Sequence, residues 1–185
     1  MALSKNDQRK LIERTALNFR YVQQNSGKDI GKLKVQLKKD PMKGASLYAR
    51  KNIKEGELIA YYKIMVFDMN TYDSPTEQTY QFDVYTKTGR ISSRLIGDLY
   101  PGSAAKARGS IPFWAYFSNE PSSNQEENAY VDDDVKGNYR NRTRLNPGDT
   151  MIYKLYASRD IPVGAEITWC YGGSYVRDYS PNCPK

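Results

Sequence analysis

Hydrophobic residues recur with two different periods along this chain. In the N-terminal segment, Ile12, Ala16 and Phe19 lie three or four residues apart, which predicts a helix with one apolar face. A Ser-x-x-Asp capping box over residues 4–7 marks its start, and the helix is predicted over residues 4–24. We expect this helix to pack one stripe against the body of the protein.

A period of two dominates the rest of the chain. Leu33, Val35 and Leu37 alternate with polar residues, which predicts a half-buried strand. Further short strands are predicted between Pro, Gly, Asn and Asp residues, at 46–49, 57–67, 79–86, 90–96, 127–132, 150–157 and 166–171. The pattern therefore predicts a mostly β fold preceded by a helix.

Two segments lack a clear period. Residues 98–112 are rich in Gly, Ala and Pro, and we predict a long connection that is functional or mobile. Residues 132–149 are predicted to form an exposed polar loop. The acidic residues near its start suggest attraction of a basic peptide, with a solvated loop as the alternative; they are Glu127, Asp132, Asp133 and Asp134.

The composition limits the chemistry. A chain of 185 residues with 39% apolar residues predicts one globular domain. It has no apolar run of about 18 residues and no secretory leader, so we expect an intracellular protein without membrane contact. Cys170 and Cys183 are too few for a disulfide framework or a four-ligand zinc site, and no metal site is predicted. The absence of His excludes Ser-His and Cys-His nucleophile pairs and an imidazole base.

The positive charge is concentrated near the N-terminus. The chain carries a formal charge of +7, and residues 1–40 hold ten Lys or Arg against four Asp or Glu. This basic segment suggests contact with nucleic acid or an acidic protein. A solvated face that promotes solubility is the alternative.

The stretch EITWCYGG at residues 166–173 places a Tyr directly before two glycines. Ile167, Trp169 and Tyr171 fall on one face of the predicted strand. Tyr171 thus stands directly before two glycines, where the backbone can adopt the widest range of conformations. A core aromatic residue followed by a turn is the alternative explanation.

Three segments resemble the SET domain family of protein lysine methyltransferases in order and spacing. They are GASLYARKNIKEGELIAYY (44–62), FWAYFSNEPSSNQEENA (113–129) and YASRDIPVGAEITWCYGGSY (156–175). The Asn-Glu-Pro-Ser sequence in the second segment resembles a divergent form found in some viral and protist SET sequences. The resemblance spans roughly residues 30–178.

The resemblance implies a site for S-adenosylmethionine. The cofactor-binding positions it implies are Gly44, Ser46, Leu47, Tyr116, Asn119 and Tyr171. Three residues depart from the family pattern: Ser46 replaces a Gly, Tyr116 replaces an Arg and Glu120 replaces a His. Glu166 matches one of the family's paired acids, and an ion-pair partner is the alternative.

The resemblance also implies a channel for the substrate lysine. Tyr171 matches the catalytic Tyr, and Tyr62, Trp169 and Tyr175 are expected to line the channel, although outside the family Tyr62 and Trp169 would be ordinary core aromatics. The position of Trp169 is one that tunes how many methyl groups are added. No cysteine cluster follows the third segment, so we expect the tail to fold back and cover the site with Tyr175 or Tyr179.

The family implies a β-clip fold of several small sheets with a knot-like crossing of the C-terminal segment. We expect a basic helical arm at 1–26, a SET domain at 27–178 and a tail at 179–185. The first functional hypothesis is a nuclear methyltransferase acting on a histone tail. The alternatives are an inactive SET-like protein- or chromatin-binding module, and a nucleic-acid or nucleosome tether that uses the basic arm.

Overall fold

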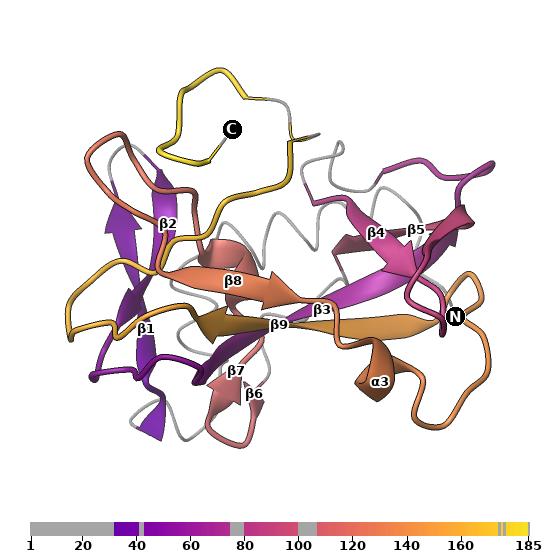
Figure 1. Ribbon diagram of the computed structural model, residues 1–185, viewed down its shortest axis with the longest axis horizontal. Coiled ribbons are helices and arrows are strands. Elements are labelled where there is room, and N and C mark those ends of the chain that lie inside the picture. Colours follow the sequence, from indigo (N-terminus) through magenta and orange to yellow (C-terminus); the bar gives the residue numbers. More distant parts are fainter. Residues whose placement is uncertain are drawn as a thin grey trace.

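The computed structural model describes residues 32–40, 43–74, 80–99, 107–173, 175 and 177–184. Within these residues the chain is mostly β, with its strands gathered into small curled sheets and only short helical turns between them (Figure 1). The predicted helix over 4–24 and the basic arm over 1–26 lie outside the described residues. In the described part, no helix has the length and apolar character needed to span a bilayer.

The first sheet is an antiparallel pair formed by β1 (Val35–Asp40) and β2 (Gly44–Ala49). Leu37 is buried and faces the buried Leu47 across the pair, which confirms the predicted half-buried strand. Gly44 begins β2 with a φ of 78°, a left-handed conformation that favours glycine.

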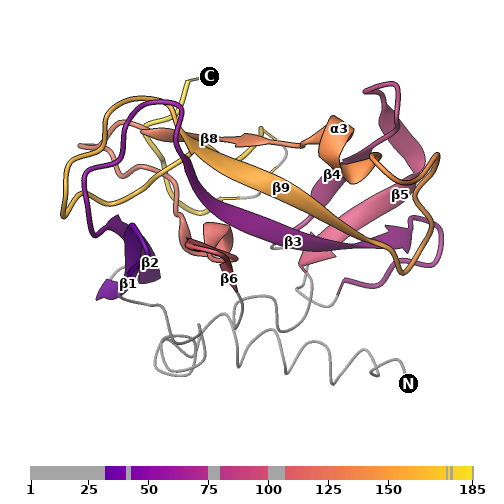
Figure 2. The ribbon, with the colours of Figure 1, turned by 90° about the horizontal axis from the view of Figure 1, so that it is seen from below.

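The largest sheet has the strand order β4-β5-β3-β9-β8. Its members are β3 (Leu58–Asp68), β4 (Phe82–Tyr85), β5 (Ile91–Leu99), β8 (Ala129–Asp132) and β9 (Thr150–Ala157). β9 buries every second residue, as its sequence TMIYKLYA predicts. Figure 2 shows β3 and β9 crossing the molecule side by side, with β1 and β2 at one end and β4 and β5 at the other.

This sheet curls so that one edge approaches its middle. The Tyr153 hydroxyl on β9 donates a hydrogen bond to the main-chain oxygen of Asp83 on β4. The Phe82 ring on β4 also meets the Tyr153 ring edge-on, with 5.7 Å between the centroids. β4 and β8 are the two edge strands of the sheet, and residues of both line the cavity described below.

The two aperiodic segments contain more structure than predicted. The end of the 98–112 connection forms a hairpin of β6 (Ala107–Arg108) and β7 (Ile111–Pro112). The 132–149 segment contains α3 (Val135–Asn138).

The prediction of a wholly exposed loop at 132–149 is therefore wrong. Asn138 is buried because its amide nitrogen donates to the main-chain oxygen of Ile152 at 2.8 Å, while its oxygen accepts from the Ile152 N–H at 2.8 Å. A buried side-chain amide is tolerated in the protein interior when its hydrogen bonds are satisfied. Ile152 is 14 positions from Asn138, so the local sequence pattern does not reveal this contact.

The predicted strand at 166–171 is also wrong, because these residues form only isolated bridges in the described structure. The Ile167 N–H donates to the Leu47 oxygen at 2.8 Å, whereas the Trp169 N–H donates to the Asn119 oxygen at 3.1 Å. No single neighbouring strand supplies the hydrogen bonds, so no regular ladder can form.

These separate partners enclose the 166–171 segment. The Thr168 oxygen accepts from the N–H of Asn128 at 3.0 Å, and the Ser118 hydroxyl donates to the Ile167 oxygen at 2.8 Å. Ile167 is fully buried as a result. We refer to residues 166–171 as the crossing segment, because they pass between several separate segments of the chain and bond to each of them.

Candidate active site

The predicted catalytic Tyr171 lies together with the three aromatic residues predicted to line the lysine channel, Tyr62, Trp169 and Tyr175. The ring centroids of Tyr62 and Trp169 are 6.1 Å apart, those of Trp169 and Tyr171 are 5.1 Å apart, and those of Tyr171 and Tyr175 are 4.8 Å apart. They come from β3, from the crossing segment and from the C-terminal residues after it, 172–184, which we call the tail from here on and which begin before the predicted tail at 179–185. All four line one cavity of about 1460 Å³. Long-range folding therefore assembles them into one wall.

Tyr171 is held by two hydrogen bonds to the segment that follows η4 (Ala115–Phe117). Its hydroxyl donates to the main-chain oxygen of Ser118 at 2.9 Å, and its N–H donates to the Glu120 carboxylate at 2.8 Å. Burial raises the pKa of the Tyr171 hydroxyl well above its usual value, and the nearby phenols of Tyr62 and Tyr80 raise it further. Tyr171 therefore remains a neutral phenol at physiological pH.

Tyr62 is buried beside Trp169. Only 2% of Tyr62 is exposed, and its hydroxyl oxygen accepts a 3.1 Å hydrogen bond from the Trp169 indole N–H. Burial raises the pKa of the Tyr62 hydroxyl, and the indole donor opposes that shift. The indole N–H can only donate, so the Tyr62 oxygen is the acceptor in this contact.

Two of the predicted cofactor residues contact each other directly. The Asn119 amide donates a 2.7 Å hydrogen bond to the Ser46 hydroxyl, and Ser46 is fully buried. A Cβ atom placed on Gly44 would meet no atom within 4 Å, so space is open beside that glycine. Leu47 is a core residue, fully buried, whose carbonyl accepts from the crossing segment.

As far as the described residues define it, the cavity wall includes Tyr116 and Asn119 but not Gly44, Ser46 or Leu47. Ser46 therefore reaches the cavity through Asn119. Leu47 acts as a core residue in this structure.

Tyr116 lies on η4 and carries an unpaired polar atom. Only 4% of the residue is exposed, and its hydroxyl is buried without a hydrogen-bond partner among the described residues. Burial raises the pKa of this hydroxyl well above its usual value. A buried hydroxyl without a partner is costly and uncommon, so Tyr116 is suited to hydrogen-bond a group bound in the cavity.

The same cavity wall includes Tyr80, which the sequence did not single out. Its ring meets that of Tyr116 edge-on at 6.1 Å, and burial raises the pKa of Tyr80 to about 12. Nothing distinguished it within a chain of 16 Tyr residues.

Glu166 forms the ion pair that was the alternative to a functional role. Its carboxylate lies 3.0 Å from the Lys43 ammonium and also accepts from the Gln125 amide at 2.9 Å. Glu120, treated above only as a departure from the family pattern, contacts Arg177 in the tail with an oxygen-to-nitrogen distance of 2.6 Å. Arg177 was not singled out either, because nothing local links positions this far apart.

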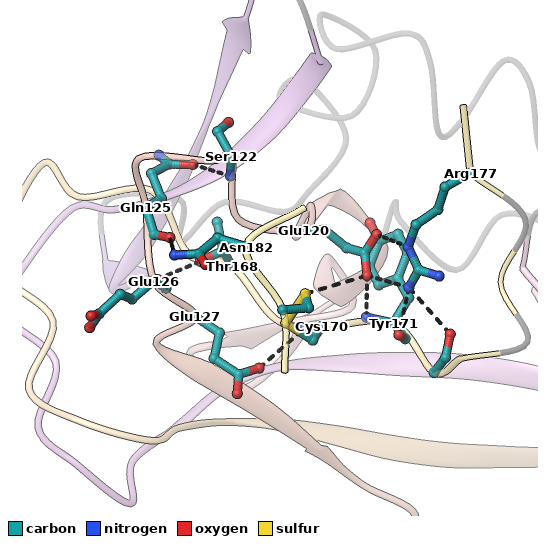
Figure 3. Close-up of a disulfide and its surroundings, with 12 residues drawn as sticks. Glu120, Ser122, Gln125, Glu126, Glu127, Thr168, Cys170, Tyr171, Arg177 and Asn182 are labelled. Carbon is teal, nitrogen blue, oxygen red and sulfur yellow. Dashed lines mark hydrogen bonds and ion pairs between the residues drawn. A yellow bond between two sulfur atoms is a disulfide. The ribbon is translucent and has the colours of Figure 1, made fainter. Parts of the chain in front are cut away.

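The two cysteines form one disulfide between Cys170 and Cys183, with 5.7 Å between their Cα atoms. It joins the crossing segment to the tail (Figure 3). The N–H of Cys170, one of the two linked residues, also donates a 3.2 Å hydrogen bond to the Glu127 carboxylate. The tail is thus tied covalently beside the aromatic wall.

Small curled sheets, an enclosed crossing segment and a tyrosine-lined cavity define a SET-type domain. A family model described as the SET domain matches residues 44–172, well over half of the chain. The chain therefore belongs to the SET domain family, as the three segments predicted.

Two solved structures are similar to this chain. One is a Plasmodium falciparum protein described as a candidate histone methyltransferase, with 17% sequence identity and a TM-score of 0.46 over 77% of this chain and 96% of that chain. The other is the Chaetomium thermophilum polycomb repressive complex 2, with 18% identity and a TM-score of 0.48. That match covers 82% of this chain and only 17% of the other. No curated protein matches the sequence.

Proposed function

We propose that this protein is an S-adenosylmethionine-dependent protein lysine N-methyltransferase. The observation that carries the proposal is the position of Tyr171. Its hydroxyl is held against the Ser118 carbonyl, at a cavity that Tyr62, Trp169 and Tyr175 also line. This is the wall that a lysine side chain would need, and the family assignment supports the same chemistry.

The residues present fit the cofactor. Tyr116 offers a buried hydroxyl without a partner, Asn119 offers an amide steadied by Ser46, and Gly44 leaves open space beside its Cα. We assign these four residues to cofactor binding. When bound, S-adenosylmethionine supplies a methyl group on a positively charged sulfur, which an amine can displace in line.

The aromatic wall prepares the lysine for this displacement. A free lysine has a pKa of about 10.4, and burial among apolar rings disfavours its charged form. Once the lysine has released a proton to solvent, its neutral nitrogen has a lone pair that could attack the methyl group of a bound cofactor, whose thioether would be the leaving group. Tyr62, Trp169 and Tyr171 exclude water and fix the direction of approach.

The absence of His does not prevent this reaction. No general base has to act at the moment of transfer, because the amine is already neutral when it reacts. Tyr171 is a neutral phenol at physiological pH, and burial raises its pKa further above that pH. Its oxygen can therefore accept from polarised C–H groups without adding a negative charge.

We propose histone tails as the substrate class and the nucleus as the location, both by analogy with the family. We also propose that the basic arm over residues 1–26 contacts nucleic acid or the nucleosome. Its charge would make that contact weaken as salt rises, so binding that is unchanged between low and moderate salt would rule it out.

A binding module without catalysis is the second candidate. It is favoured by the departures at Ser46, Tyr116 and Glu120. Ser46 and Glu120 each have a partner within the chain, however, so neither leaves a buried polar group unsatisfied. Calorimetric titration with S-adenosylmethionine distinguishes the two, because a module that has lost the cofactor site would release no heat.

The deciding experiment uses radiolabelled S-adenosylmethionine with core histones, nucleosomes and a whole-cell lysate in separate reactions. Tyr171→Phe removes the hydroxyl and is expected to lower transfer by about 100-fold. Tyr156→Phe is the matched control, because Tyr156 stacks on Tyr130 of β8 and is not part of the cavity wall. Equal labelling by wild type and Tyr171→Phe would refute the assigned role of Tyr171.

A further inference from the structure

Glu120 lies where the η4 segment, the crossing segment and the tail meet (Figure 3). Its side chain is 0% exposed. One carboxylate oxygen accepts from the Tyr171 N–H at 2.8 Å and from Arg177 Nη2 at 2.6 Å. The other accepts from Arg177 Nε at 2.6 Å and from the Tyr179 hydroxyl at 2.9 Å. Both oxygens therefore have two donors each.

Arg177 extends this contact to the backbone of the tail. Its Nη2 donates to the Tyr171 oxygen at 2.7 Å, and its Nη1 donates to the Tyr175 oxygen at 2.8 Å. The guanidinium carbon also lies 5.2 Å from the centroid of the Tyr175 ring. A single ion pair thus holds two members of the aromatic wall, Tyr171 and Tyr175.

The far end of the tail is fixed on the same segment that follows Glu120. The Asn182 N–H donates to the Pro121 oxygen at 3.1 Å, and its amide donates to the Gln125 oxygen at 2.6 Å. The disulfide to Cys170 lies next to these contacts. Glu120 itself is part of the cavity wall, so the Glu120–Arg177 pair attaches the tail directly to that wall.

The physical chemistry of the pair explains its effect on geometry. Taking a carboxylate and a guanidinium out of water costs several kcal/mol, which is recovered only when the geometry is good and the remaining lone pairs are satisfied. A bidentate Arg–carboxylate contact meets that condition and permits few alternative arrangements. Such a pair adds little net stability, but it selects one position for the groups bonded to it.

We propose that Glu120 is a positioning residue for methyl transfer. Its carboxylate holds the main chain of Tyr171 and, through Arg177, places the Tyr175 side of the lysine channel. The proposal rests on the proposed function and deepens it, because it gives the residue at the family's His position a role in placing the substrate.

The test measures transfer by Glu120→Gln and Arg177→Lys at a temperature where circular dichroism shows every variant folded. Both changes remove the charged bidentate contact, and Arg177→Lys keeps the positive charge. We expect the kcat of each to fall about 100-fold and the KM for the protein substrate to rise, with the Kd for S-adenosylmethionine unchanged. The double variant should lose no more than either single variant, because one contact is broken in all three.

The control for lost stability is Ile161→Ala. Ile161 is buried in a bridge with Ile53, and neither residue is part of the cavity wall. This variant should melt at a lower temperature yet keep the wild-type kcat while folded. A kcat for Glu120→Gln and Arg177→Lys within twofold of wild type would overturn the proposal.

A second readout separates this proposal from the proposed function. If wild type transfers no methyl group and binds no S-adenosylmethionine, the proposed function fails. Positioning is then judged by hydrogen exchange at the Tyr171 and Tyr175 amides. We expect Glu120→Gln to speed exchange at both by about tenfold relative to Ile161→Ala. Equal exchange in the two variants would overturn the positioning role whatever the activity.

Discussion

The Asn119 amide donates a 2.7 Å hydrogen bond to the hydroxyl of Ser46, the residue that replaces a glycine of the family pattern. We expect Ser46→Ala to free the Asn119 side chain and weaken S-adenosylmethionine binding about fivefold, the equivalent of one hydrogen bond of about 1 kcal/mol. Calorimetry measures the Kd. Ser123→Ala, at a serine on the wall of the same cavity, is the control. Tighter binding by Ser46→Ala would mean that Ser46 competes with the ligand for Asn119.

The contact between Trp169 and Tyr62 predicts an asymmetry in stability. Trp169→Phe leaves the buried Tyr62 hydroxyl without its donor, which costs about 1–3 kcal/mol of unfolding free energy. Tyr62→Phe leaves only the indole N–H unpaired, and Trp169 is half-buried where Tyr62 is buried, so it should cost less. Urea unfolding gives both values. The double variant should be more stable than the sum of the single effects predicts, and simple additivity would contradict the contact.

The disulfide between Cys170 and Cys183 predicts a redox-dependent stability. It closes a loop across a sequence separation of 13, and a loop of about that size is expected to contribute about 3 kcal/mol. Cys183→Ser should therefore lower Tm by several degrees in a thermal melt. Wild type treated with reductant should match the variant, and the variant should not respond to reductant. A reductant effect of equal size on both proteins would assign the change to something else.

The buried tyrosines predict loss of stability at high pH. Burial raises the pKa of Tyr80 to about 12 and that of Tyr171 well above 10, so the folded state holds these protons longer than the unfolded state. Their stabilising contribution is complete below pH 10, the ordinary tyrosine pKa, and is lost as pH rises from there through the folded values.

Ultraviolet absorbance of tyrosinate, followed together with circular dichroism, measures this. We expect the exposed tyrosines to titrate first and the buried set only as the fold is lost. Tyr171→Phe removes one late-titrating group. Titration of all 16 Tyr residues in one early transition would contradict the burial.

Local pattern was sufficient for most of the strands. The alternation in β1 and β9 is a property of neighbouring residues, because successive side chains on a strand point to opposite faces. The same reasoning failed at 166–171, where the alternation of Ile167, Trp169 and Tyr171 is present but the hydrogen bonds go to several separate segments. It also failed at Asn138, whose burial depends on an amide contact with Ile152.

The sequence by itself determined the family, most of the strands and the identity of Tyr171, Tyr62, Trp169 and Asn119 as candidates, since motif order and residue type are local information. Only the tertiary structure decided how these residues are held. Glu120 and Arg177 are 57 positions apart, and Cys170 and Cys183 have a sequence separation of 13. A buried carboxylate requires a donor somewhere in the chain, but which donor it finds depends on the path of the backbone, and no local pattern records that path.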